Sequence, residues 1–299
     1  MKITLETTQI SAELRAEIAK EIKDPKALSE FAKDEHYHVR KAAAGNAATP
    51  SDSLEELSKD KKWKVRREVG KNESSPLSAF LRLSSDRDSD VCKAVAGNEA
   101  VGNYPEGQFI LEKLSEDEDP AVRKAAAKNR KNPTENLNKL SKDSDEIEVV
   151  IATAENTATL PEDLDRLANH NDLRVKRKVA ANTSTLAETL DRLSKENDFE
   201  IKLNVANNPS TSPETLDALS KDPNKDIKVA VAKNNNTLPE TLSELAEDNT
   251  WEVKVAVAAN PNTLPGTLSK LAEEDDDDVQ IAVRLNPNTP KEVVDELTI

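Results

Sequence analysis

The sequence predicts an all-α solenoid of about ten two-helix repeats, each about 26 residues long. The first observation is a row of ten asparagines at regular spacing: Asn46, Asn72, Asn98, Asn129, Asn156, Asn182, Asn208, Asn234, Asn260 and Asn286. Successive gaps are 26, 26, 31, 27, 26, 26, 26, 26 and 26 residues, and a constant period in this range is typical of stacked repeats. The second observation is that two short apolar patterns with helical spacing flank each asparagine.

The first helix of each repeat precedes the asparagine. Position minus seven is always Val or Ile: Val39, Val65, Val91, Val122, Val149, Val175, Ile201, Ile227, Val253 and Val279. In one repeat Val253, Ala256 and Val257 lead to Asn260 with the spacing of a single buried helical stripe. Position minus ten supplies the expected N-caps: Asp88, Asp119, Asp172, Asp198, Asn224, Thr250 and Asp276. Pro120 falls at a first helical position, where proline is tolerated.

The second helix follows the asparagine. A threonine three residues on and a glutamate six residues on have the spacing of a capping box, as in Thr237 and Glu240. Leucines follow at plus eight and plus eleven, as in Leu242 and Leu245. One such pair of helices cannot bury its own apolar stripe, so we expect most of the stability to come from stacking of neighbouring repeats.

The two ends of the chain depart from the repeat. Residues 1–23 carry Ile10, Leu14, Ile18 and Ile22 at every fourth position with Ser11 as a cap, which predicts an N-terminal capping helix. The solenoid is then expected over residues 24–299, ending on a second helix from Val293 to Leu297. No polar cap is evident there, so fraying or self-association through the C-terminal end is an alternative.

The period is broken between Asn98 and Asn129, where five extra residues enter within residues 99–109. We expect a protruding loop at this insertion and a local change in the path of the solenoid. A tolerated insertion without a function is the alternative, because surface loops accept extra length at low cost.

These motifs resemble the leucine-rich repeat variant family, whose units read N-P-x-T-P-x-x-L-x-x-L-A-x-D-x-x-x-x-V-R-x-A-V-A. The resemblance runs from about Asp24 to the C-terminus and is clearest in residues 253–265. It implies a right-handed superhelix with one layer of α-helices and one of shorter 3₁₀-type helices. One member of the family binds an iron–sulfur cluster through cysteines before its repeats. This chain has only Cys92, so that feature does not carry over and no cofactor is expected.

Composition narrows the classes of function. The chain has 36% hydrophobic and 33% charged residues, with no apolar run near the ~20 residues of a membrane span. It begins without the apolar core of a signal peptide, so we expect no membrane contact and a cytoplasmic location. The net charge is −15, of which residues 1–150 contribute −3 and residues 151–299 contribute −12. The acidic half should repel phosphate, so nucleic acid is not the expected partner.

The most informative surface row lies six and five residues before each asparagine. It is doubly basic in the first part of the chain and basic-plus-apolar from Leu203 onward. The candidate binding face consists of its cations: Arg40, Lys41, Arg66, Arg67, Lys93, Arg123, Lys124, Lys176 and Arg177. The alternative is a solvated face that balances the acidic loops.

Other candidates favour structural roles. Position minus nine repeats Tyr37, Trp63, Phe199 and Trp251, which predicts packing between repeats rather than a ligand platform. The sequence predicts no catalytic group and no metal site, because His36 and His38 lack a third ligand. The expected function is a non-catalytic scaffold that binds a protein or peptide. The alternative is a nucleic-acid-binding or DNA-processing protein that uses the N-terminal basic face.

Overall fold

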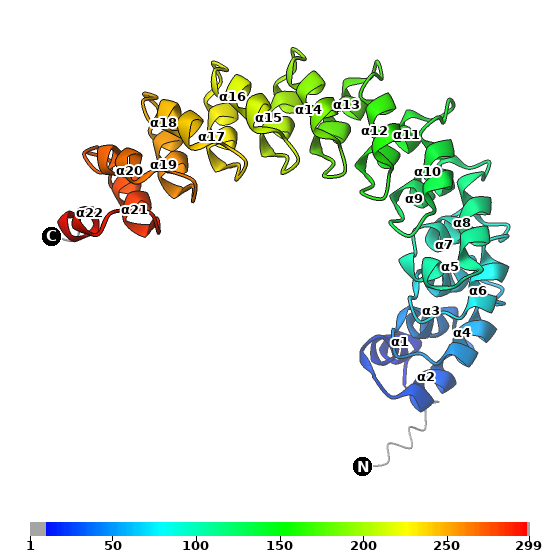
Figure 1. The fold of residues 1–299 in the computed structure, drawn as a ribbon. Helices are drawn as coiled ribbons and strands as arrows, with labels where there is room; N and C mark the ends of the chain where they lie inside the picture. The colour runs from blue at the N-terminus through cyan, green and yellow to red at the C-terminus, as the bar shows by residue number, and fades with distance from the viewer. Residues whose placement is uncertain (1–9, 298–299) are drawn as a thin grey trace. The chain divides into compact units, whose positions relative to one another are not determined.

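The computed structural model describes residues 10–297, and within this range it contains helices and turns but no strand. Two compact units divide the chain, unit 1 (Met1–Thr159) and unit 2 (Leu160–Ile299). In each unit odd-numbered helices form one layer and even-numbered helices the other (Figure 1). Each repeat contributes one helix to each layer, which confirms the predicted all-α repeat architecture.

Unit 1 begins with a helix of the odd-numbered layer. That layer comprises α1 (Ala12–Glu21), α3 (Tyr37–Gly45), α5 (Trp63–Lys71), α7 (Ser89–Ala96), α9 (Pro120–Lys128) and α11 (Ile147–Glu155). The even-numbered layer comprises α2 (Pro25–Phe31), α4 (Ser51–Leu57), α6 (Leu77–Leu83), α8 (Gly107–Ser115) and α10 (Thr134–Leu140). A 3₁₀-helix, η2 (Glu99–Asn103), lies between α7 and α8.

Unit 2 has the same alternation. Its odd-numbered layer comprises α13 (Leu173–Ala181), α15 (Phe199–Asn207), α17 (Lys225–Lys233), α19 (Trp251–Ala259) and α21 (Asp277–Leu285). Its even-numbered layer comprises α12 (Pro161–Leu167), α14 (Ala187–Ser194), α16 (Pro213–Ser220), α18 (Pro239–Leu245), α20 (Pro265–Leu271) and α22 (Lys291–Glu296). In both units neighbouring odd-numbered helices pack directly on one another, whereas neighbouring even-numbered helices barely touch. The odd-numbered layer is therefore the more closely spaced side of each unit.

The core is formed by the residues that the periodicity selects. The Val or Ile at minus seven is at most 1% exposed in every repeat, and Val257 and Leu242 are fully buried. At about 1.5–3 kcal/mol for each buried aliphatic side chain, these positions supply the main apolar stabilisation. The predicted stripes of the first and second helices are both confirmed.

Within each unit, the repeating asparagines link a repeat to the one before it. In the repeat of Asn208, the side-chain amide donates to the Ala180 and Asn182 carbonyls, at 2.8 and 3.0 Å. Its side-chain oxygen accepts from the Ser210 amide at 2.9 Å. Equivalent pairs of carbonyls accept from Asn72, Asn98, Asn129, Asn156, Asn234, Asn260 and Asn286. Each of these asparagines therefore closes its own turn and also binds the preceding repeat.

The carbonyl at position minus two belongs to a residue with a small side chain. This position holds Ala44, Gly70, Ala96, Ala127, Ala154, Ala180, Ala206, Ala232 and Ala258. A Cβ added at Gly70 would lie 3.2 Å from both Ala94 and Val95 of the next helix. Larger side chains would hold the helices too far apart for the asparagine to reach its acceptors. Arg284 takes this position in α21, where it is exposed.

The capping-box prediction for the second helices is wrong. Thr237 is buried and donates its hydroxyl to the Val231 carbonyl at 2.6 Å, which satisfies the end of the preceding odd-numbered helix. Leu238 is the N-cap of α18 and offers no side-chain acceptor. The threonine lies one residue before the N-cap, so its hydroxyl points into the turn rather than onto the amides of the second helix.

Most predicted N-caps of the first helices are confirmed. Asp88, Asp119, Asp172, Asp198, Asn224 and Asp276 accept first-turn amide hydrogen bonds. Thr250 makes no such bond, so that prediction is wrong. The expected 3₁₀ layer is also wrong here, because the even-numbered helices are α-helical. In α4, for example, the Leu54 amide donates to the Pro50 carbonyl four residues back, at 3.0 Å.

The described part of the N-terminal segment forms α1, with Ser11 capping the Leu14 amide at 3.3 Å as expected. Residues 1–9 of this prediction lie outside the described residues. The buried face of α1 is Arg15, Ala16 and Ala19. Of the expected apolar stripe, Ile18 and Ile22 are half-buried and pack against the core, whereas Leu14 is 53% exposed. The small residues Ala16 and Ala19 belong to the core cluster between α1 and α3.

The insertion is packed against the protein, which corrects the expectation of a protruding loop. Val101 of η2 is fully buried, and the Tyr104 hydroxyl donates to the Ser75 carbonyl at 3.1 Å. A Cβ at Gly107 would overlap the Val101 carbonyl, so glycine allows this close approach. Asn129 still reaches the Ala96 carbonyl at 2.8 Å, so the asparagine ladder continues past the insertion.

Replacing a ladder asparagine should cost far more than replacing its neighbour. Asn208→Ala leaves two buried carbonyls and a turn amide without their partner, at about 1–3 kcal/mol for each buried group. We expect a loss of about 2–4 kcal/mol in the free energy of unfolding, measured by urea denaturation. Asn207→Ala is the matched control, because Asn207 is exposed at the end of α15. Equal midpoints for the two variants would refute the structural role of the ladder.

Candidate binding groove

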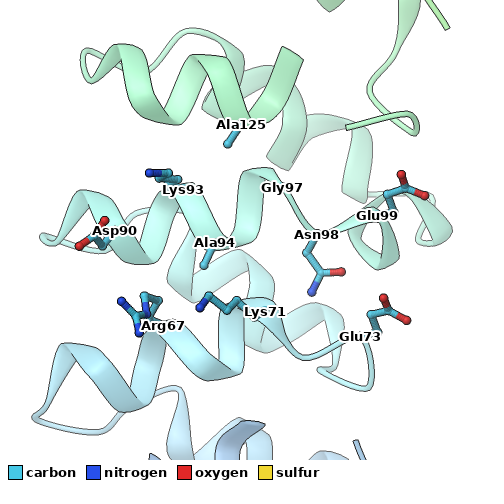
Figure 2. Close-up of a pocket in the computed structure, with 10 residues that line it drawn as sticks. All are labelled: Arg67, Lys71, Glu73, Asp90, Lys93, Ala94, Gly97, Asn98, Glu99 and Ala125. Carbon is cyan, nitrogen blue, oxygen red and sulfur yellow. The ribbon is translucent and has the colours of Figure 1, made fainter. Parts of the chain in front are cut away.

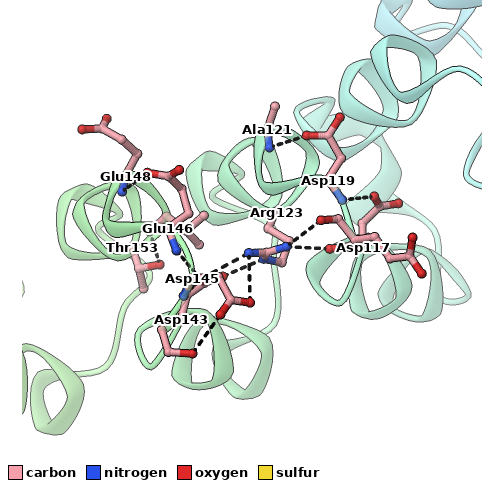
Figure 3. A network of polar contacts seen from close by, with 12 residues as sticks. Asp117, Asp119, Ala121, Arg123, Asp143, Asp145, Glu146, Glu148 and Thr153 are labelled. Atoms are coloured by element: carbon pink, nitrogen blue, oxygen red, sulfur yellow. Dashed lines mark hydrogen bonds and ion pairs between the residues drawn. The ribbon is translucent and has the colours of Figure 1, made fainter.

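Six of the nine cations in the predicted basic row form ion pairs that link neighbouring repeats. Arg123 donates Nε to Asp143 at 2.6 Å and Nη1 to the Asp117 carbonyl at 2.9 Å (Figure 3). Its side chain is only 12% exposed. It therefore joins the loop before α9 to the loop before α11, and its charge is balanced by a carboxylate of the following repeat.

The same pair recurs at position minus six along both units. In unit 1 the pairs at this position are Arg40–Asp60, Arg66–Asp86 and Arg123–Asp143, and Arg15 of α1 forms a similar pair with Asp34. In unit 2 lysines replace the arginines, in Lys176–Glu196, Lys202–Asp222, Lys228–Asp248 and Lys254–Glu274. Arg40, Arg66, Arg123 and Lys176 of the predicted binding face thus lie within the interface between repeats.

Cys92 takes the position of the arginine in one repeat. Its thiol is buried and contacts the Asp86 carbonyl oxygen at 3.3 Å. Burial raises the pKa of this thiol, and the charge of Asp117 raises it further. The thiol is therefore protonated at neutral pH, which makes it a poor nucleophile and metal ligand.

Position minus five holds the cations that face outward. Lys41 lines a hollow of about 520 Å³ between α1 and α3, together with His36, His38 and Glu68. Arg67 stacks 5.2 Å from the centre of the Trp63 ring.

Two further cations of this row are paired with acids of the next repeat. Lys124 lies 2.8 Å from Glu148, and Arg177 lies 2.8 Å from Asp198 and 2.7 Å from Glu200. Lys93 is exposed and forms no ion pair with any residue between 10 and 297.

Arg67 and Lys93 come together in a groove of about 650 Å³ across α5, α7 and α9 (Figure 2). Its lining includes the small residues Ala94, Gly97 and Ala125, which leave space between the longer side chains. Lys71 adds a third cation, 53% exposed and 3.7 Å from Glu68. The groove thus combines a small-residue floor with three cations.

The groove is polarised along its length. Glu73 and Glu99 lie at the end where α5 and α7 terminate, on the opposite side from Asp90 (Figure 2). Arg67, Lys71 and Lys93 occupy the stretch between these acids. A ligand that fits must therefore present negative charge to the middle of the groove and positive charge near Glu73 and Glu99.

Sequence reasoning found two of the three cations. Lys71 lies four residues after Arg67, and this spacing puts both side chains on the same helical face. The i, i+4 relation was thus the available signal for Lys71. Glu73 and Glu99 follow their repeat asparagines directly, a position that the periodicity alone does not connect to a groove.

The described residues offer no metal centre and no membrane span. Between residues 10 and 297 no three His, Cys, Asp or Glu side chains are grouped so that they could hold a metal ion. None of the helices described there has the length and apolar character needed to cross a bilayer.

Comparison with solved structures identifies proteins with a similar fold. A leucine-rich repeat variant of solved structure matches with a TM-score of 0.53 and 23% identity, covering 76% of this chain and 87% of that chain. The chain has the leucine-rich repeat variant fold. The described even-numbered helices show that this fold accommodates a second layer that is α-helical.

Two other structures match more loosely. An engineered protein matches with a TM-score of 0.36 and 19% identity over 96% of this chain and 94% of that chain. Yeast importin-β matches with a TM-score of 0.48 and 11% identity over 93% of this chain and 51% of that chain. No protein-family model matches the sequence, and no significant match is found among curated proteins.

Alanine substitution should lower the stability of the protein much more at position minus six than at position minus five. Arg66→Ala leaves Asp86 buried without its partner, so we expect a loss of about 3 kcal/mol in the free energy of unfolding. Arg67→Ala, at the outward position, should cost about 1 kcal/mol or less. Chemical denaturation of both variants measures the difference, and a cost for Arg67→Ala as large as that for Arg66→Ala would contradict it.

Acid should destabilise the protein through the carboxylates of the ion-pair row. Burial favours a higher pKa for Asp86, but hydrogen bonds from Arg66 and the Asp88 amide, with the Arg66 charge, bring the pKa below its ordinary value. The pKa values of further acids in this row are lowered against the same effect of burial: Asp34, Asp143, Asp222 and Asp248. The stabilisation is therefore fully present above the unfolded pKa of about 4 and is lost as the pH falls through the lower folded values.

We accordingly expect the urea midpoint to hold between about pH 7 and pH 5 and to fall steeply below about pH 4. Urea titrations at a series of pH values check this. A urea midpoint that stays constant down to about pH 3 would show that these carboxylates do not contribute to the free energy of unfolding.

Proposed function

We propose that this protein is a non-catalytic scaffold that binds a polypeptide segment along the odd-numbered layer of unit 1. The observation that carries the proposal is the groove across α5, α7 and α9, where Arg67, Lys71 and Lys93 surround a floor of small residues. Its ligand is a segment with acidic side chains for these cations and a basic residue for Glu73 and Glu99.

Several features support binding rather than catalysis. The groove contains no histidine or cysteine, and its carboxylates lie at its ends rather than as a close pair. Its open shape suits a chain laid along the repeats, which is how solenoids commonly bind extended partners.

The nucleic-acid alternative receives less support from the contacts. A phosphate backbone needs several free cations in a row, and Arg40, Arg66 and Arg123 are each paired with an aspartate. The cations that remain in the groove lie between carboxylates at its two ends, which suits the mixed charge of a polypeptide better than a uniform chain of phosphates.

The test uses a fluorescent ten-residue peptide with three aspartates at one end and two lysines at the other. Lys71→Glu with Lys93→Glu should weaken its binding to the full chain at least about tenfold, because two attractions become repulsions. Raising the salt concentration should weaken binding to the unmodified chain as well.

The matched control reverses two exposed lysines of unit 1 outside the groove, Lys26→Glu with Lys61→Glu. It carries the same change in net charge, so its binding should fall far less than that of the groove variant. If control and groove variants lose affinity equally, or neither loses any, the groove is not the binding site. Fluorescence anisotropy at a fixed salt concentration provides the measurement.

A further inference from the structure

The odd-numbered layer of unit 2 carries two continuous rows of a different chemistry. The apolar row, at position minus five, comprises Leu203, Val229, Val255 and Ile281. The acidic row, at position minus eight, comprises Glu200, Asp226, Glu252 and Asp278. Each row takes one residue from each of α15, α17, α19 and α21, and these helices pack directly on one another in sequence (Figure 1).

The two rows lie side by side on the outward face. Residues three apart in a helix share a face, so Val229 lies next to Asp226 and Ile281 next to Asp278. The buried stripe of the same helices lies at minus seven, minus four and minus three. The apolar row is half-buried in α15, α17 and α19, and Ile281 is 46% exposed in α21. Unit 2 therefore presents an apolar strip that its own packing covers only in part.

Two members of the acidic row are available for a partner. Asp226 and Asp278 are exposed, and neither forms an ion pair with another residue in the described range. Glu200 and Glu252 are paired with cations of the preceding repeat, Arg177 at 2.7 Å and Lys225 at 2.6 Å.

The lysines at minus six do not cancel these carboxylates. Lys202, Lys228 and Lys254 turn to the acids of the next loop, at 2.6 to 2.8 Å. The free charge on the side of the acidic row is therefore negative. On the other side of the apolar row, the exposed cations Lys233 and Arg284 follow Val229 and Ile281 by four and three residues.

Exposed aromatic side chains border the same face. Phe199 and Trp251, the first residues of α15 and α19, are 44% and 48% exposed. Tyr37 and Trp63, at the same position in unit 1, are half-buried and pack on the core. The prediction of packing between repeats is confirmed for the unit 1 pair. In the unit 2 pair nearly half of each side chain is exposed and can contact a partner.

We propose that the apolar and acidic rows of unit 2 bind an extended polypeptide with an apolar residue at every third position and lysine or arginine between. Packed helices lie about 8–10 Å apart. A chain in the extended polyproline II conformation has three residues per turn and advances about 3.1 Å per residue, so one turn spans one repeat and every third side chain faces the same way. The apolar side chains lie on the apolar row while the cations pair with Asp226 and Asp278. This site is separate from the groove of unit 1 and does not rest on its function.

The probe is a labelled twelve-residue peptide of four Leu-Lys-Thr units, titrated against the full chain. It should bind with an affinity that falls as salt is added. Three comparison peptides should bind at least about tenfold more weakly: Glu in place of Lys, Ser in place of Leu, and the same composition with the three-residue period scrambled. Equal binding of the Glu peptide, or of the scrambled peptide, would overturn the proposal.

Two pairs of substitutions locate the site. Val229→Lys with Val255→Lys puts charge on the apolar row and should weaken binding more than about thirtyfold. Asp226→Asn with Asp278→Asn changes only exposed side chains and should weaken it about three- to tenfold, with a smaller salt dependence. The second pair keeps the test valid if the first pair unfolds, which circular dichroism and the melting temperature report.

The matched control changes two exposed lysines of unit 1 that lie outside both proposed sites, Lys26→Val with Lys61→Val, and should leave this affinity unchanged. Loss of binding in the control, or none in the aspartate pair, would contradict the assignment. Light scattering tests whether a second copy of the chain occupies the site instead. A dimer that Val229→Lys with Val255→Lys dissociates would show that the rows bind another copy and would overturn the proposed peptide ligand. The acidic-peptide assay of the unit 1 groove is run separately, so failure of either site is recognised independently.

Discussion

Within each unit, the hydrogen bonds from the repeat asparagines to carbonyls of the preceding repeat constrain the rest of the structure. A single side chain, such as that of Asn260, closes its own turn and holds the Ala232 and Asn234 carbonyls. Because the reach of an asparagine is short and fixed, the distance between repeats is fixed as well. Small residues at minus two follow from that distance, since their carbonyls are acceptors and their side chains face the next helix. The same geometry persists across the insertion, where Asn129 reaches back over 31 and 33 residues.

A second set of contacts, the ion pairs between neighbouring repeats, neutralises many of the charged side chains. The cation at minus six and the acid of the following loop are mostly buried, as in Arg66 and Asp86 with about 8% of each side chain exposed. Removing one partner of such a pair strongly destabilises the fold. Because the charges neutralise each other, few are left to bind a ligand. The surface that remains free to vary is the outward face of the odd-numbered layer. In unit 1 its minus-five position holds cations such as Lys93, and in unit 2 it holds aliphatic residues such as Val255.

The fold could be predicted well because its determinants are periodic. The valines, leucines and asparagines recur at fixed distances, and burial of one unit by the next requires no knowledge of other contacts. The candidate site could be predicted only in part. Arg66 and Arg67 are adjacent and chemically alike, yet a helix turns by about 100° between them, so one enters the interface and the other faces outward. The capping role expected for Thr237 failed for a similar reason, because a shift of one residue directs its hydroxyl to a different carbonyl.

By itself the sequence determined the helical repeat, its period, the buried stripes and the change of chemistry along position minus five. These properties depend on residue type and on local spacing, which a linear chain records completely. The tertiary structure decided which cations are paired, that the insertion is packed, and that Lys71 joins Arg67 and Lys93 in a groove. Those outcomes depend on contacts between residues about 20 to 30 positions apart, whose distances are set only when the repeats stack.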